Sequence, residues 1–170
     1  MEEIRLSPVF LKQYKNMVQQ ILHAPGYDRG KQLEMTLVVD HCLSKEEVSA
    51  IIPQLTGTLK NMDEIFRNVR FNLADWERAE VVKNQVCPMM MTMMSSFYED
   101  YQQEVAEKKW ELLLSNLRLY HARSKLILVL TDRTYDRENE EVRQLMHPFL
   151  GRKMLMIQYH REDASFDVYR

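Results

Sequence analysis

Glycine and cysteine are scarce in this sequence. Only 4 of its 170 residues are glycine, which argues against glycine-rich phosphate loops and against many tight hairpins. There are 2 cysteines, Cys42 and Cys87, too few for a disulfide framework and without the spacing of metal ligands. We therefore expect a protein of a reducing compartment.

The sequence also lacks long apolar runs and a strong excess of either charge. With 23 basic and 25 acidic residues, its net charge of −2 predicts no broad basic surface for nucleic acid. No segment approaches the ~20 apolar residues of a membrane span, and the acidic stretch MEEIRLSPVF lacks the apolar core of a signal peptide. We expect a soluble, cytoplasmic protein that binds neither nucleic acid nor membrane.

Helical and extended patterns alternate along the chain. Apolar spacing predicts helices over 6–23, 44–62, 95–121 and 136–150. Apolar or alternating runs predict strands over 33–39, 65–73, 80–84, 126–130 and 153–159, and residues after 160 are expected to be loose or to form a short edge strand. The pattern does not assign the methionine-rich stretch 86–94.

This alternation predicts one α/β domain over 1–170. A helical extension over 1–30 would precede an α/β core over 31–160. The expected fold is a Rossmann-like, three-layer α/β/α arrangement with a mainly parallel central sheet.

Two predicted strands run directly into an aspartate, Asp40 and Asp132. Ligands bind at the carboxyl ends of parallel strands, so we expect both carboxylates to face one pocket. Together with the Ser44 hydroxyl they offer oxygen ligands suited to Mg²⁺ or Mn²⁺. The alternative is that both aspartates cap helix N-termini. Ser44 and Glu47 have the spacing of a capping box for the helix that follows.

These loops resemble those of the von Willebrand factor A (vWA) family. The run Asp40-His41-Cys42-Leu43-Ser44 resembles the family's D-x-S-x-S motif, the first part of its metal-ion-dependent adhesion site. Thr131-Asp132-Arg133 resembles its T-D-G-like turn, and VRFNLADW resembles its second strand. The resemblance covers about 33–159 and implies a metal site of Asp40, Ser44 and Asp132. It also implies a hydroxyl from a second loop, for which Thr92, Ser95 and Ser96 are the candidates.

The sequence departs from the family pattern at two of these positions. Cys42 replaces a serine ligand, and a thiol is a poor ligand for Mg²⁺. Arg133 replaces a glycine and would place a positive charge near the cation. The expected adhesion site is therefore degenerate. Cys42 beside His41 lacks a third orienting group for nucleophilic catalysis, so we expect a buried, inert cysteine.

The resemblance implies a non-enzymatic, intracellular interaction module with a protein partner, such as an AAA+ ATPase or a multi-protein assembly. Its binding surface would comprise His41, Cys42, Thr92, Ser95, Ser96, Arg133 and Thr134. The alternative is a metal-dependent phosphohydrolase-like enzyme that uses Asp40 and Asp132. The scarcity of glycine and the lack of an evident general base count against this alternative.

Overall fold

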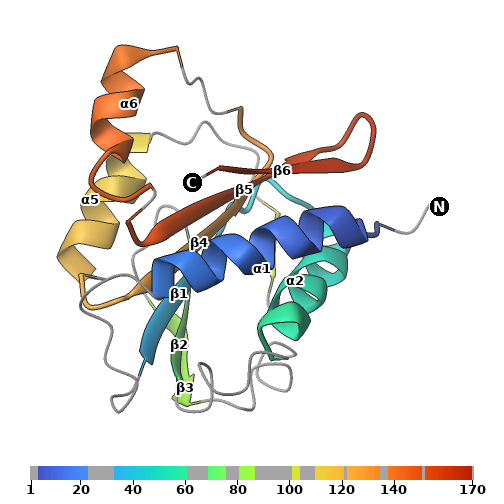
Figure 1. Cartoon of the computed structure of the whole chain (residues 1–170), viewed down its shortest axis with the longest axis horizontal. Coiled ribbons are helices and arrows are strands. Elements are labelled where there is room, and N and C mark those ends of the chain that lie inside the picture. The colour runs from blue at the N-terminus through green and yellow to red at the C-terminus, as the bar shows by residue number, and fades with distance from the viewer. Residues whose placement is uncertain are drawn as a thin grey trace.

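A six-stranded sheet lies between helices in the computed structural model (Figure 1). The structure describes residues 4–22, 33–60, 69–75, 81–86, 101–103, 110–120, 122–134, 138–150 and 152–169. The strands are β1 (Leu33–Val39), β2 (Val69–Asp75), β3 (Val81–Val86), β4 (Leu126–Thr131), β5 (Met154–His160) and β6 (Ser165–Tyr169). The helices are α1 (Pro8–Leu22), α2 (Lys45–Lys60), α5 (Trp110–Tyr120) and α6 (Glu140–Met146).

The sheet has the strand order β3-β2-β1-β4-β5-β6. Its inner strands β2, β1, β4 and β5 are parallel, while β3 and β6 pair antiparallel at the two edges. The predicted α/β class with a mainly parallel sheet is confirmed. Because β1 and β4 are parallel neighbours, their carboxyl ends lie side by side, and the loops that follow them meet at one edge.

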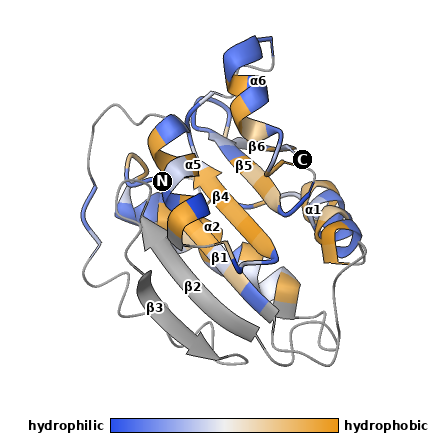
Figure 2. Cartoon of the chain, turned by 90° about the vertical axis from the view of Figure 1, so that its left-hand side faces the viewer, coloured by the Kyte–Doolittle hydropathy of each residue, from blue (hydrophilic) through white to orange (hydrophobic). Residues whose placement is uncertain are grey.

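The central strand β4 is buried along its whole length. Leu126, Leu128 and Leu130 belong to a cluster with residues of α1 and α2. Ile127 and Val129 belong to a second cluster with residues of α5 and α6. Figure 2 shows β4 as an apolar strand between these helices. A strand that is apolar on both sides is expected where helices cover both faces of a parallel sheet.

Two predicted helices have different bounds in the structure. The prediction of one helix over 95–121 is wrong at Tyr101–Gln103, which is not helical. The Tyr101 hydroxyl donates to the Leu43 carbonyl, and the Gln103 amide donates to the Cys42 carbonyl, so these side chains serve a loop contact. Within the predicted helix 136–150, α6 begins only at Glu140, because the Asn139 side chain accepts the first free N–H groups.

The C-terminal residues form an edge strand, which was one of the two expectations. β6 pairs with β5 and carries the sheet beyond the predicted core boundary at residue 160. Phe166 of β6 packs on Phe10 of α1, with ring centroids 5.6 Å apart. The N-terminal helix therefore contacts the last strand of the sheet. No helix within the described ranges has the length and apolar character needed to cross a membrane.

We predict that α1 is an integral part of the core. Leu22 of α1 is 1% exposed, whereas Leu119 of α5 is 70% exposed. Leu22→Ala should lower the free energy of unfolding by about 2–5 kcal/mol, because it removes buried methyl groups and leaves a cavity. Leu119→Ala, the matched control, should change it by less than about 0.5 kcal/mol. Urea denaturation measures both, and equal small losses would mean that α1 does not pack on the core.

Candidate functional site

Asp40 lies at the carboxyl end of β1 and is fully buried. Its backbone N–H donates to the carbonyl of Leu130 at 2.9 Å, so Asp40 extends the pairing of β1 with β4. Its Oδ1 atom accepts the Cys42 N–H at 3.0 Å, and its Oδ2 atom accepts the Thr131 hydroxyl at 2.8 Å. A buried carboxylate requires such donors. Asp40 therefore fastens its own loop to the end of β4.

Ser44 and Glu47 form the predicted capping box at the start of α2. The Ser44 hydroxyl accepts the Glu47 N–H at 3.1 Å, and the Glu47 carboxylate accepts the Ser44 N–H at 2.8 Å. This exchange satisfies two N–H groups that a helix end would otherwise leave free. It also holds the Glu47 carboxylate at the carboxyl edge of the sheet.

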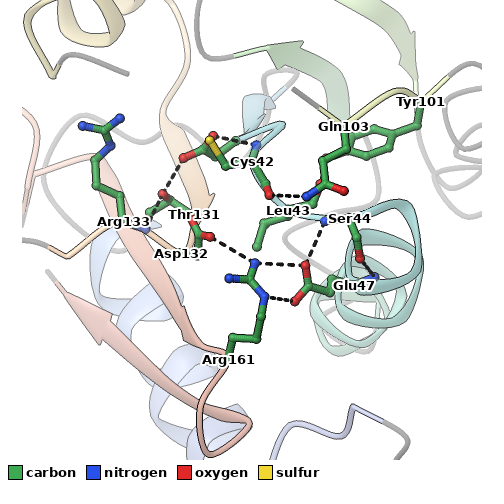
Figure 3. Close-up of polar contacts among 11 residues, drawn as sticks. Cys42, Leu43, Ser44, Glu47, Tyr101, Gln103, Thr131, Asp132, Arg133 and Arg161 are labelled. Atoms are coloured by element: carbon green, nitrogen blue, oxygen red, sulfur yellow. Dashed lines mark hydrogen bonds and ion pairs between the residues drawn. The ribbon is translucent and has the colours of Figure 1, made fainter. Parts of the chain in front are cut away.

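The Arg161 guanidinium bridges Glu47 and Asp132 (Figure 3). Its Nε and Nη2 atoms donate to the two oxygens of Glu47 at 2.7 and 3.0 Å. The Nη2 atom also donates to Oδ2 of Asp132 at 3.0 Å. Arg161 follows β5, Asp132 follows β4, and Glu47 belongs to α2. One side chain therefore joins three segments that leave the same edge of the sheet.

These contacts shift the pKa values of the ion pair. Burial alone would raise the pKa of Glu47, but hydrogen bonds from Arg161 and Ser44 and the charge of Arg161 lower it below its ordinary value of 4.5. The hydrogen bond to Glu47 raises the pKa of Arg161, and Asp132 adds to this effect. Both groups are therefore charged at neutral pH.

The structure places the predicted binding residues of the first loop in different surroundings. The His41 ring packs on Tyr101, with centroids 4.6 Å apart. Cys42 is half-buried and forms no disulfide with the other described residues, so the expectation of a buried cysteine is corrected. Cys42 lies in the loop that follows β1, at the margin of the core. The apolar character of a cysteine side chain alone does not indicate this position.

The Arg133 guanidinium lies away from the carboxylates, which corrects its expected place beside a cation. It sits over the ring of Trp110 in α5, 5.8 Å from the centroid, and Figure 3 shows it pointing away from Asp132. Its backbone N–H donates to the Thr131 hydroxyl at 2.9 Å. The cation beside Asp132 is Arg161 instead. Thr92, Ser95 and Ser96 lie outside the described residues.

A cavity of about 430 Å³ opens beside the Arg161 network. Its lining residues come from the ends of β4 and β5 and the turn after β5: Asp132, Thr134, Gln158, Tyr159, His160, Arg161 and Glu162. Asp40 is not among them, because its carboxylate is fully buried. This cavity therefore contains Asp132 without Asp40, and the expectation that the two face one pocket is not met at this cavity. They share an edge of the sheet, but Asp40 contacts Thr131 and Asp132 contacts Arg161.

The three predicted metal ligands do not fit a divalent cation as they are arranged. Both Asp40 oxygens accept hydrogen bonds from the protein, Ser44 caps α2, and Asp132 pairs with a guanidinium. A cation would have to displace these donors and withstand the nearby positive charge of Arg161. Within the described parts of the chain, no group of three or more His, Cys, Asp or Glu side chains could hold a metal ion.

Sequence reasoning did not identify Arg161 as part of the site, and it assigned Glu47 only a capping role. Glu47 carried a local signal, its spacing from Ser44. Arg161 carried none, because it meets Glu47 only after the strands are placed beside one another. No protein-family model, curated protein or solved structure matches the chain.

We predict that the Glu47 carboxylate stabilises the fold mainly above pH 4.5. Its pKa is lower in the folded than in the unfolded state, so its contribution is complete above the unfolded value and is lost as the pH falls through the folded value. Glu47→Gln should lower the free energy of unfolding by about 1 kcal/mol at roughly pH 7. The difference from wild type should be smaller at roughly pH 3 than at pH 7.

Urea denaturation at the two pH values measures this effect. Glu46→Gln is the matched control, since Glu46 is exposed in the same helical turn. A loss for Glu47→Gln that is independent of pH would contradict an ionic role for Glu47.

We also predict that Mg²⁺ does not stabilise the wild-type protein. A ligand that binds only the folded state must raise the melting temperature. Because Arg161 occupies Asp132, about 5 mM Mg²⁺ should shift the melting temperature by less than about 1 °C. A contrary result would be a rise in melting temperature with Mg²⁺ that is absent in Asp132→Asn and present in the control Glu141→Gln. It would show that a metal site forms despite Arg161.

Proposed function

We propose that the chain is a vWA-type interaction module that binds a protein partner at the carboxyl edge of its sheet. We use "carboxyl edge" for residues 40–44, 131–134 and 158–162. The observation that carries the proposal is the Arg161 network, which holds loops from different strands in fixed positions beside an open cavity. Open α/β sheets bind their ligands at this edge, where neighbouring strands lead to opposite sides.

The arrangement of the two motif loops supports the vWA resemblance. The loops after β1 and β4 belong to adjacent parallel strands, as the three-layer vWA fold requires. Asp40 and Thr131, one from each loop, share a hydrogen bond. The departure is Arg161, whose guanidinium stands beside the aspartate that the family would give to its metal. In this proposal the loops are ordered without a metal ion.

A protein partner fits this edge better than a nucleic acid does. The chain has a net charge of −2, and the edge contributes the carboxylates of Asp132 and Glu162. Arg133 and Arg161 balance these two negative charges at the same edge, so the edge has no positive excess to attract phosphates. The resemblance adds that the partner would be an AAA+ ATPase or a component of a multi-protein assembly.

The phosphohydrolase alternative receives no specific support from the geometry. Asp40 is fully buried, and both its oxygens accept hydrogen bonds within the protein. A nucleophilic carboxylate must reach its substrate. Assays with generic phosphatase and nuclease substrates test this alternative directly. Activity of the wild type that is absent in a folded Asp40→Asn variant would contradict the proposed module.

We predict that Thr134→Arg abolishes partner binding without unfolding the protein. Thr134 is exposed and lines the cavity, so an arginine there adds bulk and positive charge to the proposed surface. Ala122→Arg is the matched control, because Ala122 is exposed before β4, at the opposite edge of the sheet. Affinity capture from cells, quantified by mass spectrometry, compares the two variants with wild type.

A specific partner should decrease at least about tenfold with Thr134→Arg and stay unchanged with Ala122→Arg. Circular dichroism checks that both variants are folded. Partners that are lost equally with both variants, or with neither, would contradict a binding surface at the carboxyl edge.

A further inference from the structure

Three polar residues form a buried row across the ends of three neighbouring strands. Asp40 follows β1, Thr131 ends β4, and Gln158 lies two residues before the end of β5, where it is paired in register with Thr131. Each is at most 2% exposed. The Thr131 hydroxyl donates a hydrogen bond to the Asp40 carboxylate. The Oε1 atom of Gln158, in contrast, has no hydrogen-bond partner among the described residues.

A buried amide oxygen without a partner costs stability, so its position calls for a physical reason. Gln158 is also one of the residues that line the cavity of about 430 Å³. Rotation of the terminal amide exchanges its oxygen and nitrogen, so this side chain can offer an acceptor to a group in the cavity. A bound ligand with hydrogen-bond donors would then satisfy the amide oxygen.

The charges around the cavity select the kind of ligand. Asp132 and Glu162 are carboxylates in its lining. The Arg161 guanidinium is shared between Asp132 and Glu47, and the His160 ring pairs with Asp167 at 2.6 Å. With histidine neutral, the charges of these groups sum to a negative value. An anion is therefore disfavoured, and a cation that donates hydrogen bonds is favoured.

We infer that the cavity binds a guanidinium or ammonium group carried by a basic side chain of the partner. This inference rests on the proposed function and names the chemistry of its partner. The volume falls in the range of roughly 300–1,000 Å³ typical of ligand sites and accommodates one long side chain. The Gln158 amide and Oδ1 of Asp132, the oxygen to which Arg161 does not donate, are its acceptors, so Arg161 need not be displaced. Glu162 adds negative charge at the rim.

The direct test uses two glycine-flanked, capped pentapeptides, one with a central arginine and one with a central citrulline. Citrulline has nearly the same shape but no charge. Isothermal titration at low salt should show the arginine peptide binding at least about tenfold more tightly. Equal affinities would overturn the inference. Agmatine, a free guanidinium compound, is the third probe, and tighter binding of agmatine than of the peptide would assign the cavity to a small amine instead.

Variants of the protein test the named acceptors. Gln158→Met keeps the side-chain shape but removes the amide, so it should weaken the arginine peptide at least about tenfold. It should also raise the melting temperature by about 2–4 °C, because it removes a buried polar group without a partner. Unchanged affinity, or a lower melting temperature, would overturn the role of Gln158.

The rim charge has a matched control. Glu162→Gln should weaken the arginine peptide roughly threefold at low salt, and Glu141→Gln, an exposed position on α6, should leave it unchanged. Equal effects would mean that only net charge matters and would overturn the site.

If no peptide binds while Thr134→Arg still abolishes partner capture, this inference fails and the proposed function stands. If Thr134→Arg has no effect on capture while the arginine peptide binds, the proposed function fails instead.

Discussion

The Arg161 guanidinium is the contact on which the arrangement of the carboxyl edge depends. It pairs with both oxygens of Glu47 and reaches Asp132 as well, so it ties the turn after β5 to α2 and to the end of β4. A planar guanidinium matches a carboxylate with two parallel hydrogen bonds, which an ammonium group does not. Glu47 is in turn fixed by Ser44, so the ion pair rests on the helix cap.

The parallel sheet determines where these groups meet. Since β1, β4 and β5 run in the same direction, the residues that follow them leave the sheet at one edge. Apolar clusters on both faces hold the strands, and the polar residues begin where the apolar runs end. The buried Asp40–Thr131 hydrogen bond lies at this boundary, next to Gln158. In our proposal the loops are therefore ordered before a partner arrives, which reduces the entropic cost of binding.

Local sequence patterns predicted most of the helices and strands, because helices and strands depend on residues that are close in the sequence. The apolar run of β4, the Ser44 cap and the position of Asp40 after β1 could all be read from the sequence. Tyr101 could not, because its spacing fits a helix while its hydroxyl binds a loop carbonyl. Arg161 could not be assigned either, since 114 residues separate it from Glu47. Contacts of that range follow from the packing of the sheet and leave no local signal.

Hydrogen exchange of wild type and Arg161→Met tests most directly whether Arg161 orders the carboxyl edge. Loss of the ion pairs should speed exchange at least about tenfold at the amides of Ser44 and Arg133. The amide of Lys125, which donates to the Glu34 carbonyl at the opposite edge, should exchange at the wild-type rate. Unchanged exchange at Ser44 and Arg133, or equal acceleration at both edges, would contradict a local ordering role for Arg161.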